Sequence, residues 1–134
     1  MPEWQATLDA LQALPEIGTE APVGCGGMTL GTAIGLLLTA IEPRITAAAI
    51  GGVFVYEALT EAARQITIPI EFLLPWDDEE NNRQSGLALF DACASKEKVL
   101  HAYPGRPNQV PRFEVDNSVR FIVRHLGRVG TSPA

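Results

Sequence analysis

The chain has 134 residues, of which 46% are hydrophobic and 19% are charged, and its formal net charge is −6. This composition is that of one globular domain with a single core, over residues 1–134, and it excludes a disordered segment. The acidic balance disfavours nucleic acid and an anionic membrane surface as the main partner. The N-terminal segment lacks the positive charge and apolar core of a secretory signal, so we expect a cytoplasmic protein.

Helix and strand patterns alternate from the start of the chain. Apolar residues at every third or fourth position predict a first helix, which Pro15 ends. The segment that follows it is rich in glycine and small apolar residues, as expected of a buried strand and a buried helix. The first four predicted elements are a helix over residues 4–14, a strand at Ala21–Gly27, a helix at Thr32–Ile41 and a strand at Ile45–Ile50.

The second half of the chain continues the alternation. Its predicted elements are a helix at Ala58–Arg64, a strand at Ile68–Pro75, a helix at Ser85–Ala94, a strand at Lys98–Tyr103, and a last helix with Val115, Val119, Ile122 and Leu126 on one face. Strands that alternate with helices form right-handed βαβ units. The sequence therefore predicts an α/β fold, with a parallel sheet of about four strands and helices on both faces.

The uncharged segment Ala21–Ile41 is long enough to cross a bilayer. Gly27, Gly31 and Gly35 repeat in it at the spacing of a helix contact in membranes. Its first half, however, is rich in glycine and proline, which disfavour a helix. Because the rest of the chain has the pattern of a water-soluble α/β protein, we expect no membrane span.

The cysteines and the acidic run point to structural roles. Cys25 and Cys93 have apolar neighbours and no CxxC spacing, so we predict free, buried thiols in a reducing compartment. The acidic run Asp77–Glu80 has no histidine beside it, and such a run is usually a solvated loop. We therefore expect no metal and no cofactor.

The glycine-rich run after the first strand fits nucleotide-binding turns poorly. Gly24 and Gly26 match the first two glycines of a dinucleotide turn, but Thr29 stands where the third is needed. Gly26 and Gly31 have the spacing of a P-loop, but Thr32 replaces the lysine that grips phosphate. Neither nucleotide site is predicted.

The same run fits the nucleophile elbow, G-x-S-x-G, more closely. GMTLG at Gly27–Gly31 matches this pattern with Thr29 in the serine position. Flanking glycines suit the strained backbone of such a turn. The motif lies between a predicted strand and a buried helix, where an elbow places its hydroxyl at the helix N-terminus.

With these motifs, the chain resembles the C-terminal half of an α/β-hydrolase of the small bacterial esterase and dienelactone-hydrolase kind. The resemblance covers nearly the whole chain and implies a single, truncated domain of that family. The segments that carry it are WQATLDALQALPEIG, PVGCGGMTLGTAIGL, IEPRITAAAIGG, IPIEFLLPWDDE and LHAYPGRPNQVPRFE.

The resemblance implies where a catalytic triad would lie. In such enzymes the nucleophile, the acid and the histidine follow in this chain order. The nucleophile position is Thr29, and the acid position is Asp78, with Asp77 as a second choice. The histidine position is occupied by Pro107. The resemblance also assigns the backbone N–H of Leu30 as one oxyanion-hole donor.

The departure at the histidine position determines the expected activity. Proline has no ionisable group, and a hydroxyl without a base is a poor nucleophile. His101 lies inside a predicted strand and His125 near the end of the last helix, so we expect both to be structural or surface residues. Arg106 follows the last strand, but an arginine cannot act as a base.

The resemblance also implies an unpaired sheet edge, because this chain supplies only the second half of the family's sheet. Val23–Gly27 would lie at that edge, and unpaired edges bind partners. We expect a homo-oligomer, most simply a dimer, through this edge. A separate polypeptide with the first half of the fold and a longer parent protein are the alternatives.

Two functions follow from these expectations. The first is a degenerate α/β-hydrolase-like protein with little or no triad-type ester hydrolysis, which binds a partner or a small acyl or ester ligand. The second is an active carboxylic-ester hydrolase with Thr29 as nucleophile, Asp78 as acid and a base from a partner protomer. A histidine within reach of Thr29 Oγ1 would favour the second.

Overall fold

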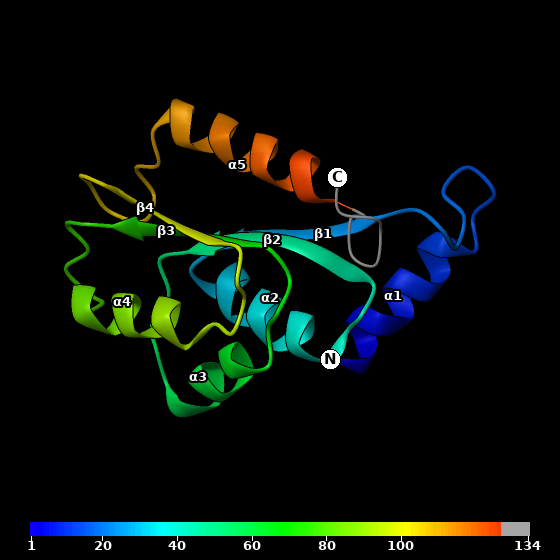
Figure 1. The fold of residues 1–134 in the computed structure, drawn as a ribbon, viewed down its shortest axis with the longest axis horizontal. Helices are drawn as coiled ribbons and strands as arrows, with labels where there is room; N and C mark the ends of the chain where they lie inside the picture. Colours follow the sequence, from blue (N-terminus) through cyan, green and yellow to red (C-terminus); the bar gives the residue numbers. More distant parts are fainter. Residues whose placement is uncertain (127–134) are drawn as a thin grey trace.

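The computed structural model describes residues 1–126, which form five helices and four strands (Figure 1). The helices are α1 (Pro2–Gln12), α2 (Leu30–Ile41), α3 (Glu57–Arg64), α4 (Arg83–Ala92) and α5 (Arg112–His125). The strands are β1 (Val23–Met28), β2 (Ile45–Gly51), β3 (Ile70–Pro75) and β4 (Lys98–Tyr103). Every predicted element is present, with slightly shifted ends.

The strands form one parallel sheet in the order β1-β2-β3-β4. Each strand pairs with the next along the chain, as Gly26 does with Ala49 and Phe72 with Leu100. Helices α2, α3 and α4 cover one face, and α5 covers the other (Figure 1). The predicted α/β fold is confirmed. The carboxyl ends of all four strands meet at one end of the sheet, which is where ligands bind in such folds.

The central strands β2 and β3 form the rigid middle of the molecule. Both have long apolar runs because each is covered on both faces. Ile50 of β2 and Phe72 of β3 are each 1% exposed. Helix α2 packs Leu36 against this core, and α4 packs Leu89. The loops at the carboxyl end of the sheet therefore connect strands and helices that are well packed.

Two predicted boundaries were wrong for local reasons. Strand β3 begins at Ile70 and not at Ile68, because Pro69 has no N–H to donate; its carbonyl accepts a hydrogen bond from Ala48 N (3.1 Å). Helix α4 begins before Ser85, because the Asn82 side chain caps it and accepts a hydrogen bond from Gln84 N (2.7 Å).

The cysteines are both free, as predicted. Cys93 is buried at 3% exposure, whereas Cys25 is only half-buried, so the predicted burial is confirmed for Cys93 alone. Burial raises the pKa of both thiols. Both thiols are therefore less readily ionised than an exposed cysteine.

Helix α1 is less buried than its apolar pattern suggests. Trp4 is 48% exposed and Leu11 is 43% exposed. The helix is anchored by Arg44, which donates hydrogen bonds to Asp9 Oδ1 (2.8 Å) and to Glu42 Oε1 (2.7 Å). Glu42 is itself buried, and the hydrogen bond from Arg44 lowers its pKa. One arginine thus joins α1 to the start of β2.

The uncharged segment Ala21–Ile41 divides into a strand, a sharp turn and the 12-residue helix α2. Within residues 1–126, none of the helices has both the length and the apolarity needed to cross a bilayer.

Candidate functional site

The turn between β1 and α2 holds one residue in a strained conformation. Thr29 has φ 54° and ψ −113°, and within residues 1–126 it is the only non-glycine residue with a positive φ. A β-branched residue adopts such a conformation rarely, at a cost of about 1–3 kcal/mol. The turn leaves the Thr29 side chain exposed. This is the backbone geometry expected of a nucleophile elbow.

The two glycines of the GMTLG motif have different roles. A Cβ atom at Gly27 would lie 2.8 Å from the carbonyl carbon of Gly31, too close for any side chain. A Cβ atom at Gly31 would meet no atom of the described residues within 4 Å. Gly27 is therefore required for the turn to close onto α2, whereas Gly31 is not.

The elbow is tied to the end of β2 by a buried threonine. Thr32 is 0% exposed, and its Oγ1 donates to Gly51 O (2.6 Å) and accepts from Gly51 N (2.9 Å). Gly51 O also accepts a hydrogen bond from Thr29 N (3.0 Å). These bonds fix the position of Thr29 relative to the core.

The three predicted triad positions lie around one cavity. It has a volume of about 310 Å³ and opens at the carboxyl end of the sheet. Its lining residues are Thr29, Asp78, Glu79, Glu80, Arg106, Pro107 and Asn108. The β1–α2, β3–α4 and β4–α5 loops, far apart in sequence, thus supply one site.

Asp78 uses its carboxylate to shape its own loop. Its Oδ1 accepts hydrogen bonds from Glu80 N (2.9 Å) and Asn81 N (3.1 Å), and its Oδ2 accepts one from Asn81 Nδ2 (2.9 Å). Asp77, the second choice for the acid, instead accepts a hydrogen bond from Gly105 N (2.9 Å) and joins the β3 and β4 loops. Asp78, and not Asp77, lines the cavity with Thr29.

The loop that carries Pro107 is supported by hydrogen bonds from the Tyr103 hydroxyl. The Tyr103 hydroxyl donates towards Arg106 O and Pro107 O, each at 3.4 Å. Burial of this side chain, followed by the nearby charge of Asp78, raises the pKa of Tyr103 to about 12. On the outer side of the loop, Arg106 Nη2 donates to Glu79 Oε1 (2.9 Å). The hydrogen bonds of Tyr103 and of Arg106 thus connect the loop of Pro107 to β4 and to the β3–α4 loop.

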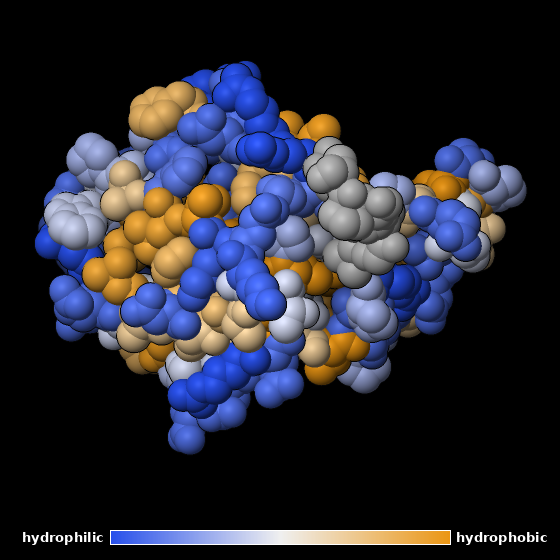
Figure 2. All heavy atoms as spheres, in the orientation of Figure 1, coloured by the Kyte–Doolittle hydropathy of each residue, from blue (hydrophilic) through white to orange (hydrophobic). Residues whose placement is uncertain are grey.

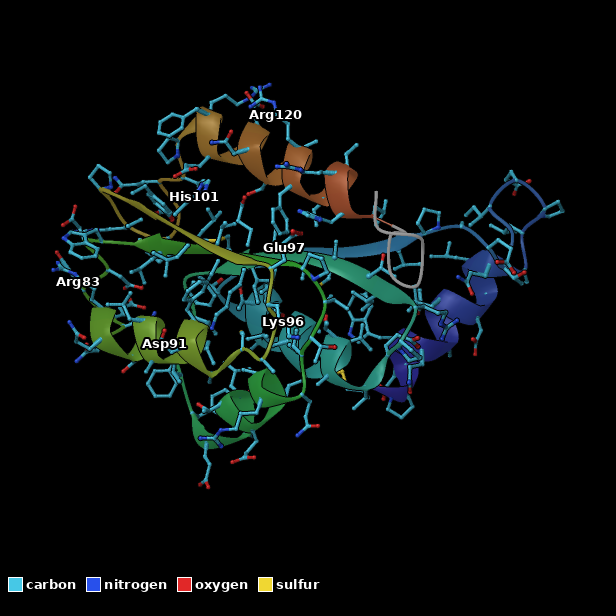
Figure 3. All side chains as sticks on the ribbon, in the orientation of Figure 1. Arg83, Asp91, Lys96, Glu97, His101 and Arg120 are labelled. Atoms are coloured by element: carbon cyan, nitrogen blue, oxygen red, sulfur yellow. The ribbon has the colours of Figure 1, made fainter. Side chains whose placement is uncertain are left out.

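Both histidines lie elsewhere and have acidic partners. His101 Nδ1 lies 2.8 Å from Glu114 Oε1, on the face of the sheet that α5 covers (Figure 3). His125 Nδ1 lies 3.0 Å from Glu97 Oε2, and its ring packs against Phe121. Neither residue is among those that line the Thr29 cavity. Their pairing agrees with the structural roles expected for them.

The cavity thus combines an exposed hydroxyl with carboxylates and one arginine. The described residues that line it include no imidazole, and the sequence of residues 127–134 contains no histidine either. Leu30 is the first residue of α2, where backbone N–H groups have no partner within the helix. Its N–H follows Thr29 directly in the chain, and the oxyanion role that the resemblance assigns to it stays a prediction.

Two residues that organise the site are absent from the sequence-based expectations. Thr32 was expected to begin a helix and to mismatch a P-loop, and no hydrogen-bonding role was predicted for it, although a threonine in an apolar helix is a signal for a buried hydrogen bond. Tyr103 ends an apolar strand, and nothing in the sequence indicates that its hydroxyl supports the following loop.

Comparison with known proteins gives matches among solved structures. No family model matches the chain, and no curated protein matches it. A cold-adapted esterase from an Arctic intertidal metagenomic library is 38% identical, with a TM-score of 0.85 over 92% of this chain and 57% of the esterase. The chain therefore spans little more than half the length of that esterase.

More distant structures share the fold. The esterase domain of a Rhodothermus marinus protein is 17% identical, with a TM-score of 0.67 over 95% of this chain and 64% of that domain. Pyrococcus horikoshii acylaminoacyl peptidase is 11% identical, with a TM-score of 0.78 over 98% of this chain and 28% of the peptidase. The chain therefore has part of an α/β-hydrolase fold, the fold that these esterases and this peptidase share with it.

Proposed function

We propose that this chain is a degenerate α/β-hydrolase-like protein, which binds a small acyl or ester ligand at the Thr29 cavity and has little or no triad-type hydrolysis. The observation that carries this proposal is the position of Pro107. It lines the cavity together with Thr29 and Asp78, at the place where the family resemblance leads us to expect the histidine. The cavity thus retains the nucleophile and acid positions without a base between them.

The missing base has a large kinetic cost. General acid–base catalysis contributes about 10²–10⁴-fold to such reactions. Asp78 is a poor substitute for the histidine, because its two oxygens accept three hydrogen bonds that tie them to its own loop. Among the described residues, the lining of the cavity thus offers Thr29 carboxylates but no imidazole to take its proton.

The charges of the cavity indicate the kind of ligand. Asp78, Glu79 and Glu80 line it, and Arg106, the one cation that lines it within residues 1–126, is already paired with Glu79. A free carboxylate would meet like charges here, which disfavours binding. A neutral ester or amide would avoid this repulsion, and its carbonyl oxygen could accept a hydrogen bond from Leu30 N.

A second candidate function is an active carboxylic-ester hydrolase with Thr29 as nucleophile. The strained backbone of Thr29 favours it, because such strain persists where the surrounding structure enforces it, often at working sites. Its base would have to come from a partner protomer. His125 is a poor source, because it is 7% exposed and paired with Glu97.

The test is covalent labelling with a fluorophosphonate probe, read by intact mass. We expect no adduct on the wild-type chain. A stoichiometric adduct that disappears in Thr29→Ala and persists in Thr67→Ala, a matched exposed threonine outside the cavity, would establish the hydrolase instead. Intact mass detects the modified chain itself, so a contaminating esterase cannot produce this result.

Ligand binding is tested separately by NMR. Ethyl butyrate and butyrate are titrated into labelled protein, and the amide signals of Thr29 and Leu30 are followed. We expect shifts with the ester and not with the acid. Equal shifts with both ligands, or none with either, would contradict the proposed binding site.

A further inference from the structure

The outer edge of β1 is unprotected. Within residues 1–126, β1 pairs on one side only, with β2. Its sequence, VGCGGM, contains no charge and no proline, which are the usual means of blocking a free edge. The opposite edge, β4, carries Lys98 and His101. Of the two sheet edges, β1 is therefore the one suited to pairing.

Two apolar grooves flank this edge, one on each face of the sheet. The groove on the α2 face has a volume of about 280 Å³ and includes Trp4 and Ile34. The groove on the α5 face has a volume of about 380 Å³ and includes Met28 and Val119. Gly26 lines both grooves. A single strand residue can line grooves on both faces because nothing in the described chain covers the edge beside it.

Helix α5 presents a row of exposed valines beside the same edge. Val115, Val119 and Val123 recur at every fourth residue and are 44%, 57% and 70% exposed. All three line the groove that β1 borders. We call them the valine row. Helix α5 nonetheless packs closely on β1, because a Cβ atom at Gly24 would lie 3.1 Å from the side chain of Ile122.

We propose that a second copy of this chain docks on this face. The β1 strands of the two copies pair antiparallel around a two-fold axis normal to the sheet, and the two α5 helices pack antiparallel through their valine rows. Each copy then offers the same patch to the other, as two-fold symmetry requires. The two sheets become one, and the grooves on both faces are closed.

The pairing of β1 and the packing of α5 require the two-fold axis at the same place. Gly26 is near the middle of β1, and Val119 is the middle residue of the valine row. Both line the same groove. One axis through this point therefore serves the strand pair and the helix pair, placing Val119 opposite its own equivalent and Val115 opposite Val123 of the other copy.

The charges beside the valine row favour this antiparallel arrangement. Asp116, Arg120 and Arg124 follow the row along α5, one turn apart, and Arg120 points away from the sheet (Figure 3). With Val119 on the axis, Asp116 of one copy lies at the level between Arg120 and Arg124 of the other, at about 1.5 Å of rise per residue. Opposite charges therefore meet, whereas a parallel pair would align like charges.

Other occupants of this face are distinguishable. The cold-adapted esterase has a little less than half of its chain outside the matched region, and a polypeptide of that kind could cover β1 instead. The β4 side, seen in Figure 2, has an apolar area between α4 and β4 bordered by hydrophilic residues. A dimer could also use that side, where Val99 is 39% exposed.

The first measurement is the mass of the purified chain in solution by light scattering. We expect a dimer, at twice 14.4 kDa. Val119→Asp should convert it to a monomer, because a desolvated charge would face its own equivalent on the axis. Val99→Asp, an exposed valine on the other edge, should leave the dimer intact. Circular dichroism of both variants checks that they remain folded.

Cross-linking locates the axis without disturbing the fold. Under mild oxidation, Val119→Cys should give a disulfide-linked dimer on a non-reducing gel, and Val99→Cys should not; the wild-type chain measures what the native cysteines contribute. A monomer at every concentration, or a dimer that only the Val99 variants break or cross-link, would overturn the proposal. So would a chain that stays monomeric alone but forms an equimolar complex with the co-expressed remainder of the esterase fold.

Discussion

The side chain of Thr32 and the backbone of Gly51 hydrogen-bond to each other in both directions: Thr32 Oγ1 donates to Gly51 O at 2.6 Å and accepts from Gly51 N at 2.9 Å. This pair joins the first turn of α2 to the last residue of β2. Since Thr29 N also donates to Gly51 O, one glycine at the end of a buried strand holds the whole elbow in place.

Replacing Thr32 with valine should destabilise the fold. Valine keeps the shape but leaves the N–H and carbonyl of Gly51 without this partner, at a cost of about 1–3 kcal/mol. Urea unfolding at equilibrium measures the change, and Thr32→Ser, which keeps the hydroxyl, should lose clearly less. Equal losses in the two variants would mean that packing, and not the hydrogen-bond pair, sets the contribution of Thr32.

The two glycines of the elbow motif should respond in opposite directions to alanine. Gly27→Ala places a Cβ atom 2.8 Å from the carbonyl carbon of Gly31, so we expect a loss of about 1–3 kcal/mol as the backbone shifts. Gly31→Ala meets open space in a helix and should gain about 0.5–1 kcal/mol. Thermal unfolding of both variants checks this, and a destabilised Gly31→Ala would contradict it.

Restoring the residues expected of the family should restore nucleophile activation. In Thr29→Ser/Pro107→His, the imidazole enters the cavity that Asp78 also lines, and the methyl group of Thr29 is removed. A base typically contributes about 10²–10⁴-fold, so we expect the fluorophosphonate reaction to accelerate by at least about 10²-fold over wild type. Thr29→Ala/Pro107→His is the matched control and should remain unlabelled. Labelling of both variants would place the reaction at another residue.

The anchor of α1 should weaken in acid. The hydrogen bond from Arg44 lowers the pKa of Glu42 below its ordinary value of 4.5. A lowered folded-state pKa stabilises the fold above 4.5, and this contribution disappears as the pH falls through the folded-state value. Glu42→Gln should therefore be less stable than wild type at neutral pH, with the difference shrinking well below pH 4.5. Urea unfolding at both pH values measures it; a difference that does not change with pH would show that the charge of Glu42 is not involved.

The fold could be predicted from the sequence because its signals are local. Apolar runs such as Ile45–Ile50 have a length and composition typical of buried strands, and they alternate with helical patterns. The strand boundary at Ile70 was missed because Pro69 could be placed either just inside the strand or just before it; only the hydrogen bond to its carbonyl decides.

Burial was harder to predict than secondary structure. The apolar residues of α1 and the valine row of α5 have the periodicity of core-facing helices, yet they are largely exposed. Periodicity indicates which side of a helix is apolar, but not whether another element covers it. Whether it is covered depends on the elements packed beside it, and within residues 1–126 β1 has a neighbouring strand on one side only.

At the candidate site, the spacing of the motifs identified the positions that come together. It did not predict the side-chain contacts that hold them there. Thr29, Asp78 and Pro107 line one cavity as the resemblance implied. The support from Thr32 and Tyr103 depends on contacts between residues far apart in the sequence, which no local pattern reports.

The order of the strands in the sheet has a consequence for how the molecule forms. Because spatial order and chain order coincide, each strand after β1 pairs with a strand that precedes it in the chain, and no later segment must be inserted between strands that have already paired. Paired residues of neighbouring strands are 22 to 28 residues apart in the sequence, as Ala48 is from Ile70 and Ile70 is from Lys98, and parallel pairing over such separations is slow because each connection must close first. Within residues 1–126, the strand edges that remain unpaired at the end of this assembly are the outer edges of β1 and β4.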